Sequence, residues 1–427
     1  MITVFTPIHR LDSESLHSLC ESLSIQTNTN FEWVVMLNGP ILLSGGKSSL
    51  KKLHEIIGSY DINVRILSSS AKNNIGALKA ECCEKAAGSI LVELDYDDLL
   101  THNALQVIQD TFDSLPEVNF FYSNCWEFTP DGASNEPYGA YYGWKSKPYG
   151  GEVQNISFPA LPQYLRRIEW SPNHVRAFRR LAYEQVGGYD KTIEVGDDHD
   201  LMCRFYLMFG ETGFYHYDDV LYHYRVHSGN TSGKGGRNKD VQKQIDINYI
   251  NHAEKMWMKW AEDNELDCLD LGGRFNSPEG YLTVDLLDAD IIMDLTMNWD
   301  KIPDDSVGVL RAYHVLEHLP NSIHFFNEAF RVLAPGGLLL IEVPSTNGLG
   351  AFSDPTHVKY FNLLSFEYFT TKEYARYIHP EYTGRFQKSR VTEYDWQTKF
   401  GPVTVISAQL ICQKGWYEEN WCGEKEM

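Results

Sequence analysis

An apolar run that ends in a cluster of acids is the feature that most constrains the fold of this 427-residue chain. Residues 90–94 read Ile-Leu-Val-Glu-Leu, and Asp95, Tyr96, Asp97 and Asp98 follow. Side chains at positions i and i+2 share one face of a strand, so Asp95 and Asp97 should project together beyond its carboxyl end. Two carboxylates this close repel each other, and a hard divalent cation with oxygen ligands removes the repulsion. The alternative is an acidic turn that merely ends a strand.

Strand-like and helix-like stretches alternate before this cluster. Apolar strands are expected at residues 2–7 and 31–37, and a helix is expected between them at residues 13–26. A further helix should begin after Asn74 and end near Gly88. The order strand, helix, strand, helix, strand predicts a parallel sheet that binds ligands at the carboxyl ends of its strands.

Six short motifs follow one another in the first half of the chain. They are Thr6-Pro7, Asn74-Ile75-Gly76, residues 94–98, residues 186–190 (Val-Gly-Gly-Tyr-Asp), residues 197–201 (Asp-Asp-His-Asp-Leu) and residues 224–227 (Tyr-Arg-Val-His). In this order they resemble a family 2 glycosyltransferase of the GT-A fold, over residues 1 to about 235. The resemblance implies a manganese or magnesium ion that bridges the diphosphate of a nucleotide-sugar. It puts Asp97 on the metal, Asp95 near the nucleotide ribose, and Pro7 and Asn74 in the nucleotide-sugar site.

The same resemblance assigns roles to two later motifs. His227 stands where a third metal ligand is often found, and the alternative is a histidine of a surface loop. Asp198 corresponds to the general base that deprotonates the acceptor hydroxyl, with Asp197 as its partner, which fits direct displacement with inversion. Both acids could also cap a helix that we expect to begin at Asp200, and that role is compatible with catalysis.

One residue departs from the glycosyltransferase pattern. An aspartate that contacts the nucleotide base is common after the second strand, and this chain has Asn38 there. An asparagine amide can still hydrogen-bond a uracil edge, so uridine is the favoured base.

Aromatic residues are frequent between about residues 129 and 170. They are Tyr138, Tyr141, Tyr142, Trp144, Tyr149 and Trp170. Flat aromatic faces stack on sugar rings, so this segment could form a lid or an acceptor cradle; it could also be a surface excursion packed by its own side chains.

A second signature begins after a helical linker. Residues 266–273 read Leu-Asp-Cys-Leu-Asp-Leu-Gly-Gly, and residues 280–286 read Gly-Tyr-Leu-Thr-Val-Asp-Leu. Glycines after a strand let the backbone approach a ligand, and an acid that ends the next strand can accept two hydrogen bonds from a ribose. Residues 312–319 (Ala-Tyr-His-Val-Leu-Glu-His-Leu) and 328–341 complete the pattern.

Residues 266 to about 414 resemble a compact class I S-adenosylmethionine-dependent methyltransferase. The resemblance implies that Gly272 and Gly273 approach the methionine portion of the cofactor, that Asp285 binds the ribose, that Asp294 lies near the adenine, and that His314 flanks the cofactor, as does Glu317. Residues 274–279 replace the usual third glycine and helix start, so a methyltransferase-like fold without activity is an alternative. His357 could be the base for a hydroxyl acceptor or a structural histidine bonded within its turn. The alternating run at residues 403–411 predicts the closing strand of this sheet.

Composition limits the choice of partners. A formal charge of −21 argues against a nucleic-acid partner, because a phosphate backbone calls for a basic face. The eight cysteines show no metal-ligand spacing and are expected to be reduced thiols of a cytoplasmic protein. No apolar stretch approaches 18 residues, so we expect neither a signal peptide nor a membrane span.

The sequence as a whole predicts an α/β protein with two Rossmann-like domains. These are a GT-A glycosyltransferase domain at residues 1–240, a helical linker at 241–264, a methyltransferase-like domain at 265–415 and a tail at 416–427. We expect transfer of a sugar, from a nucleotide-sugar donor, to a glycan or glycoconjugate acceptor, and O-methylation of a glycan with S-adenosylmethionine. The alternatives are a second domain that only binds the acceptor or a partner, and a catalytically dead carbohydrate-binding protein.

Overall fold

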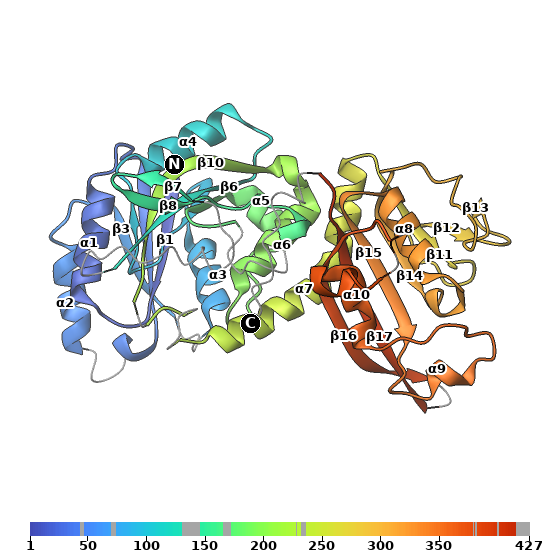
Figure 1. The fold of residues 1–427 in the computed structure, drawn as a ribbon. Helices are drawn as coiled ribbons and strands as arrows, with labels where there is room; N and C mark the ends of the chain where they lie inside the picture. Colours follow the sequence, from blue (N-terminus) through green and yellow to red (C-terminus); the bar gives the residue numbers. More distant parts are fainter. Residues whose placement is uncertain are drawn as a thin grey trace. The chain divides into compact units, whose positions relative to one another are not determined.

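The computed structural model describes residues 1–42, 47–69, 74–129, 146–164, 172–227, 229–231, 236–378, 380, 382–398 and 401–415. Most of the predicted aromatic segment and all of the predicted tail lie outside the described residues. They are Tyr138, Tyr141, Tyr142, Trp144, Trp170 and residues 416–427. The chain divides into two compact units, and the boundary between Ala253 and Glu254 falls inside one helix (Figure 1).

The first unit is built on one mixed β-sheet with the strand order β3-β2-β1-β4-β9-β6-β10-β5. Its strands are β1 (Ile2–Ile8), β2 (Phe31–Leu37), β3 (Val64–Ser68), β4 (Ile90–Glu93), β5 (Leu99–Leu100), β6 (Phe120–Phe128), β7 (Ser146–Tyr149), β8 (Glu152–Asn155), β9 (Arg176–Arg179) and β10 (Phe214–Arg225). Its helices are α1 (Ser13–Ser24), α2 (Lys47–Ile57), α3 (Ile75–Lys85), α4 (Ala104–Ser114), α5 (Arg180–Gln185), α6 (Asp197–Phe209) and the first part of α7 (Asn238–Asp263).

Helices cover both faces of this sheet. The core on one face joins the apolar sides of α1, α2 and α4 to strand residues such as Val4 and Trp33. The core on the other face joins α3, α5 and α6 to their strand neighbours Phe5 and Val34. Side chains of consecutive strand residues thus pack into the cores on opposite faces of the sheet, because side chains alternate between the two faces along a strand. The result is a three-layer α/β/α unit.

The predicted parallel arrangement is confirmed for the amino-terminal strands. β1 pairs in parallel with β2 and β4, and β2 pairs in parallel with β3. Beyond β4 the sheet is mixed, because β9 runs antiparallel to both β4 and β6. The sequence patterns missed α2 and β3, whose side chains are largely half-buried or exposed.

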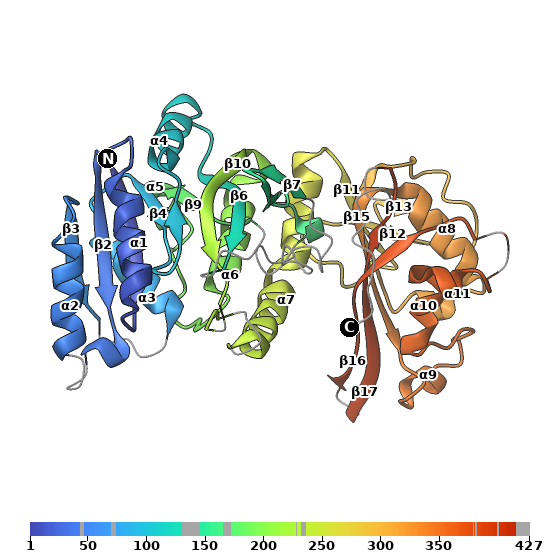
Figure 2. The ribbon, with the colours of Figure 1, turned by 60° about the vertical axis from the view of Figure 1, so that its left-hand side comes forward.

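The second unit is built on a sheet with the order β13-β12-β11-β14-β15-β17-β16. The strands are β11 (Asp267–Leu271), β12 (Leu282–Asp285), β13 (Ile291–Ile292), β14 (Val307–Tyr313), β15 (Leu333–Pro344), β16 (Phe386–Thr398) and β17 (Gly401–Cys412). The helices are the last part of α7, α8 (Ser322–Val332), α9 (Gly350–Ser353), α10 (Glu367–Thr370) and α11 (Lys372–Ala375). Figure 2 shows α8 and α10 on one side of this sheet, where their aromatic residues join the core.

Strands β11 to β15 are parallel, and β17 runs antiparallel to β15 and β16. The strand predicted at residues 403–411 is β17, which is last in the sequence but lies between β15 and β16 rather than at the edge. The order of the parallel strands reverses at β11, with β12 on one side and β14 on the other. A crevice at this reversal is where open α/β sheets bind ligands.

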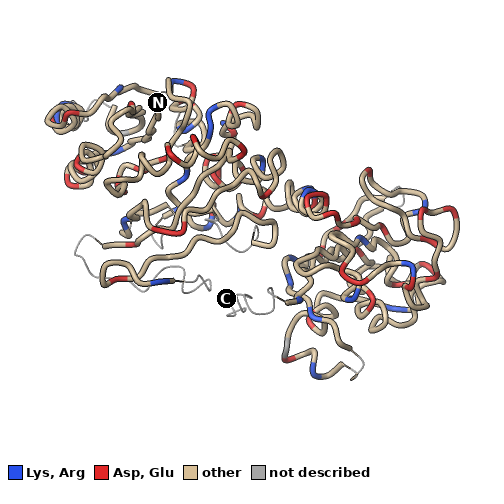
Figure 3. Tube along the Cα trace, turned by 90° about the horizontal axis from the view of Figure 1, so that it is seen from above, with Lys and Arg blue, Asp and Glu red and all other residues tan. Residues whose placement is uncertain are grey.

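Charge is spread over the chain. Figure 3 shows aspartate and glutamate residues along both units, in keeping with the net charge of −21. None of the helices in the described ranges combines the length and the apolar character that crossing a membrane requires.

Candidate active site

A cavity of about 520 Å³ opens in the first unit where the parallel strands end. Its wall includes Pro7 near the end of β1, Asn38 directly after β2, and Asp95 and Asp97 after β4. Further lining residues are His9, Arg10, Lys79, Glu93, Asp98, His174, Arg176, Asp197 and Asp198. Five of the six motifs, although far apart in the sequence, therefore supply residues to one cavity, and the motif at residues 186–190 does not.

Asp97, which lines the cavity, contacts His227, which is not among the lining residues. His227 Nε2 lies 2.7 Å from Asp97 Oδ2, and both side chains are partly exposed. The backbone N–H of Gly229 donates to His227 Nδ1 over 3.0 Å, so in this arrangement the neutral ring carries its proton on Nε2 and donates it to Asp97. A carboxylate and an imidazole are ligands that manganese accepts, and these two fit the predicted metal site. For Nε2 to bind a metal, the ring proton must move to Nδ1, and the hydrogen bond from the Gly229 N–H to Nδ1 must break.

Asp95 lies deeper than Asp97. Burial, opposed by Lys79 and aided by the neighbouring acids Glu93 and Asp97, raises the pKa of its carboxyl to about 7. A cation bound close by would favour the ionised form. The predicted pair of acids is therefore found side by side on one wall, in the turn after β4 rather than on the strand itself.

Asp98, to which the sequence analysis gave no role, ties this turn to β10. Its side chain accepts hydrogen bonds from Tyr222 Oη at 2.8 Å and from the backbone N–H of Arg225 at 2.7 Å. Arg225 Nε in turn donates to the backbone carbonyl of Asp97 at 2.7 Å. These bonds fix the acidic turn against the strand that leads to His227.

A buried ion network lies beneath the cavity. Lys79 Nζ lies 2.6 Å from Glu93 Oε1 and 3.2 Å from Asp197 Oδ2. Arg176 Nη1 lies 3.5 Å from Glu93 Oε2 and 2.6 Å from Asp198 Oδ2. The side chains of Lys79, Glu93, Arg176 and Asp197 are at most 7% exposed, so these charges depend on each other. The motifs missed Lys79, Glu93 and Arg176, because each lies within an ordinary helix or strand pattern.

Asp197 and Asp198 open helix α6, which begins three residues earlier than expected, after Gly196 with φ of +73°. The prediction that the helix starts at Asp200 was wrong, because the acids occupy its first turn, where the helix dipole stabilises carboxylates. Burial raises the pKa of Asp197 to about 6. For Asp198, burial raises the pKa but the nearby Arg176 and Lys79 outweigh it and hold the pKa well below its usual range.

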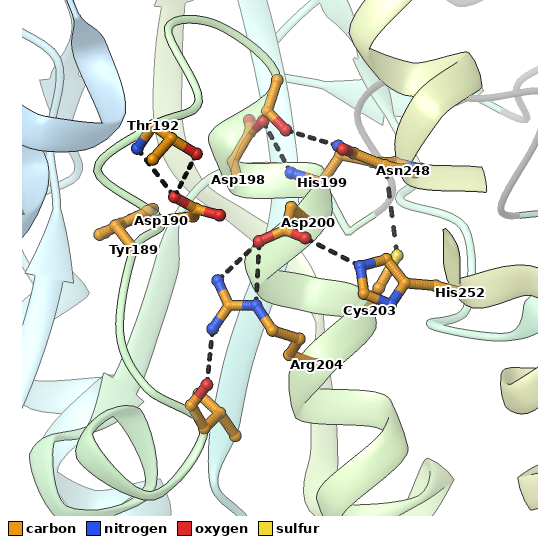
Figure 4. A network of polar contacts seen from close by, with 12 residues as sticks. Tyr189, Asp190, Thr192, Asp198, His199, Asp200, Cys203, Arg204, Asn248 and His252 are labelled. Carbon is orange, nitrogen blue, oxygen red and sulfur yellow. Dashed lines mark hydrogen bonds and ion pairs between the residues drawn. The ribbon is translucent and has the colours of Figure 1, made fainter. Parts of the chain in front are cut away.

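The first turn of α6 is held from several sides (Figure 4). Asp198 Oδ1 accepts the backbone N–H of His199 at 2.8 Å. Asp200 receives Arg204 Nη2 at 2.7 Å and lies 2.8 Å from His252 Nε2 of α7. Asp200 thus anchors the helix, while Asp198 keeps an exposed edge, 22% of its side chain, toward the cavity.

Asn74 does not line the cavity. Its Oδ1 accepts the backbone N–H of Ala77 at 2.7 Å and caps α3, and its Nδ2 donates to the carbonyl of Lys191 at 2.7 Å. The adjacent Gly76 explains the rest of this motif. A Cβ there would lie 2.6 Å from the carbonyl oxygen of Ile193 and 2.7 Å from that of Asp190. The motif therefore lets α3 approach the loop that leads to the catalytic candidates.

The predicted cofactor residues of the second unit gather at the carboxyl ends of its parallel strands. Gly272 follows β11, Asp285 ends β12, and His314 follows β14. Gly272 has φ of +71°, and a Cβ on Gly273 would lie 2.4 Å from Asp270 Oδ2, so both glycines also serve local packing. Asp294, on the segment after β13, accepts from Thr296 within its own turn.

His314 lies between two acids and one aromatic ring. Its Nδ1 lies 3.4 Å from Glu317 Oε1 and its Nε2 lies 3.1 Å from Glu342 Oε1. Burial lowers the pKa of the ring, but the carboxylates of Glu317 and Glu342 raise it to about 9. The ring stacks on Trp396 with centroids 5.6 Å apart. The Nδ1 of His357 lies 2.9 Å from the carbonyl oxygen of Ala351.

Comparisons with known proteins match part of the second unit to a family model and find distant relatives and structural neighbours for a larger part of the chain. Residues 278–341 match the family model described as "Methyltransferase domain". A 44-residue stretch, 10% of the chain, is 46% identical to 17% of a Mycolicibacterium smegmatis protein named "Probable S-adenosylmethionine-dependent methyltransferase".

Two further relatives match more of the chain. The O-antigen biosynthesis protein RfbC of Myxococcus xanthus is 24% identical over 238 residues, which are 55% of this chain and 16% of that protein. The chain thus spans about a sixth of the length of these curated relatives. Among solved structures, the mannosyltransferase PcManGT from Pyrobaculum calidifontis, in complex with GDP-Man and Mn²⁺, covers 61% of this chain and 64% of its own. Its identity is 16% and its TM-score 0.37. Part of the second unit is therefore similar to a methyltransferase domain, and the distant structural neighbours include a sugar transferase.

Proposed function

We propose that the first unit transfers a sugar from a nucleotide-sugar to an acceptor hydroxyl, with inversion and with help from a divalent metal. The observation that carries this proposal is the cavity at the strand ends, which is lined by Asp95, Asp97 and Asp198. Breaking the bond between sugar and diphosphate leaves negative charge that must be stabilised as it develops. Manganese or magnesium would supply that stabilisation.

The residues around the cavity divide this work. Asp97 and His227 would hold the metal, Asp95 would contact the nucleotide ribose, and Asn38 would bond the base, for which we favour uracil. Pro7 would lie against the nucleotide at the end of β1.

Asp198 is our proposed general base. It is ionised because Arg176 and Lys79 depress its pKa, so it takes the acceptor proton only as the new bond forms. Asp197 is buried and forms an ion pair with Lys79, and it would position this turn of α6.

The test separates binding from chemistry. Uridine diphosphate is titrated into the whole chain with and without Mn²⁺, and release of uridine diphosphate from a panel of its sugar esters is measured. Asp97→Asn should weaken Mn²⁺-dependent binding and leave metal-free binding unchanged. Asp198→Asn should bind normally but lower turnover about 100-fold or more. Asp113→Asn, an exposed acid of α4, is the matched control. Normal turnover in Asp198→Asn would refute the assignment, and no turnover of any nucleotide-sugar by the unaltered chain would favour a carbohydrate-binding protein.

For the second unit we propose S-adenosylmethionine-dependent O-methylation of a glycan. The match of residues 278–341 to a methyltransferase domain supports it, as do the strand reversal at β11 and the place of Asp285 at the end of β12. The alternative is a module that binds the acceptor or a partner without catalysis; the segment 274–279, which forms no helix, favours that alternative.

A calorimetric titration with S-adenosylhomocysteine decides between these two. Binding by the whole chain that is lost in Asp285→Ala and kept in Asp300→Ala, an exposed acid of the same unit, would support a working methyltransferase. If neither the unaltered chain nor the control binds, the module without catalysis is favoured.

We also place the protein in the cytoplasm, because Cys20, Cys82, Cys83, Cys125, Cys203, Cys268 and Cys412 are free thiols.

A further inference from the structure

Three side chains with metal-ligand chemistry converge in the second unit, on residues to which neither resemblance assigns a metal. Glu317 and His318 belong to the short turn that follows β14, and His357 belongs to the loop after β15. One possible ligand atom from each lies within 4.8 Å of the other two. The rings of His318 and His357 have their centroids 4.9 Å apart.

The backbone holds these two segments together. The carbonyl oxygen of Glu317 accepts the N–H of Val358 at 2.9 Å and the N–H of Lys359 at 3.0 Å. The loop that carries His357 is therefore bonded directly to the residue that supplies the carboxylate. The cluster is a built feature of the fold rather than a chance approach of two surface loops.

Glu317 is a buried acid that lacks a hydrogen-bond donor. The residue is 2% exposed, and neither carboxylate oxygen has a hydrogen-bond partner among the described residues. The nearest cationic group is His314, whose Nδ1 lies 3.4 Å from Oε1. A buried carboxylate without donors is costly, and such groups are normally paired or coordinate a metal. Oε2 lies in neither that ion pair nor any hydrogen bond among the described residues, so Glu317 can ligate a cation beside its pairing with His314.

The two histidines are oriented as metal ligands usually are. His357 Nδ1 lies 2.9 Å from the carbonyl oxygen of Ala351, which can only accept, so Nδ1 carries the proton. His318 Nδ1 lies 3.0 Å from Thr356 Oγ1. That hydroxyl donates its own proton to Asp354 at 2.6 Å and so accepts from His318.

Both neutral rings consequently present an unprotonated Nε2. In metal sites the second ring nitrogen typically donates to a carbonyl, a hydroxyl or a carboxylate in this way, which fixes the tautomer and the ring orientation.

We propose that Glu317, His318 and His357 bind a divalent transition-metal ion of the zinc class. Two imidazoles and one carboxylate suit zinc far better than calcium or magnesium, which prefer oxygen ligands throughout. Three protein ligands leave a coordination position open for an oxygen ligand, as in catalytic zinc sites. The site lies at the carboxyl edge of the sheet, where the methyl acceptor would bind if the second unit acts as proposed. A His357 that ligates through Nε2 is a metal ligand and cannot also be the general base.

The test uses the whole chain with Asp97→Asn and His227→Ala, which removes the candidate metal ligands of the first unit. Zn²⁺ is titrated calorimetrically into this variant, and the zinc retained after dialysis is measured. We expect one zinc per chain and a rise in the unfolding temperature of the second unit. Adding His318→Gln or His357→Gln should lower the zinc affinity at least tenfold and abolish the rise.

His324→Gln is the matched control, because this half-buried histidine of α8 bonds the carbonyl of Met297 and lies outside the cluster. It should leave zinc binding unchanged, and circular dichroism checks that every variant is folded. Failure of the folded parent variant to bind Zn²⁺ would overturn the proposal, as would unchanged affinity in both His→Gln variants. If either His→Gln variant fails to fold, the parent titration alone decides. None of these readouts depends on sugar or methyl transfer.

Discussion

Replacing Lys79 by methionine should destabilise the first unit strongly. Lys79 Nζ lies 2.6 Å from Glu93 Oε1 and 3.2 Å from Asp197 Oδ2, and the side chain is 7% exposed. Methionine fills a similar volume but leaves Asp197 without that cation and Glu93 with only Arg176, at 3.5 Å. Removing one partner of a buried ion pair costs about 3–5 kcal/mol, because the remaining charge stays desolvated. We expect a loss in this range.

The measurement is differential scanning calorimetry of the whole chain. Transitions of the two units are followed in one scan, so the second unit is an internal reference that Lys79→Met should leave unchanged. Lys52→Met, an exposed lysine of α2, is the matched control and should shift neither transition measurably. The double variant Lys79→Met with Glu93→Gln should recover about 1 kcal/mol or more, since it neutralises one of the stranded acids.

A small effect would refute this reasoning. If Lys79→Met costs less than about 1 kcal/mol, the network is not desolvated as its exposure implies. If Glu93→Gln worsens the loss, Glu93 is stabilised chiefly by Arg176 and by the hydroxyl of Tyr189, which donates to its Oε2 at 3.1 Å.

Three other changes test separate parts of the structure. Burial, aided by Arg176, lowers the pKa of His174 to about 3, so the unfolded state takes up a proton first as pH falls below 6.5. The free energy of unfolding should therefore drop by about 2 kcal/mol by pH 5. His174→Gln should remove that part of the pH dependence, measured by urea unfolding. Gly76→Ala should cost about 1–3 kcal/mol in thermal unfolding of the first unit, because the new Cβ meets the carbonyl oxygen of Ile193. Trp299→Ala should lower the unfolding free energy of the second unit by about 3–5 kcal/mol, measured in urea, since Trp299 is fully buried.

Local chemistry made much of the candidate site predictable. Asp95, Asp97 and Asn38 follow strands that are recognisable from their apolar runs, and parallel strands end at one edge of a sheet, so the sequence order alone brings them close. The same logic located Asp285 in the second unit, whereas His314 was implied by the resemblance to methyltransferases.

The charged residues beneath the cavity could not be predicted in this way. Lys79 lies on a helix where a lysine suggests a solvated face, and Arg176 lies on a strand that joins the sheet antiparallel to β4. Their burial follows from contacts with Glu93 and Asp197, which are distant in the sequence. The cluster of Glu317, His318 and His357 was missed as a unit for the same reason, because each residue alone has an ordinary explanation.

The boundary inside α7 limits how this protein can be taken apart. Tyr249 is fully buried and His252 reaches Asp200 in the first unit. A turn later, Glu254 accepts the hydroxyl of Tyr281, and Trp257 donates to the carbonyl of Gly336 in the second unit. A cut or a crossover anywhere in this helix takes core side chains from one unit or the other. Recombination that separates the two halves would have to duplicate the helix rather than divide it.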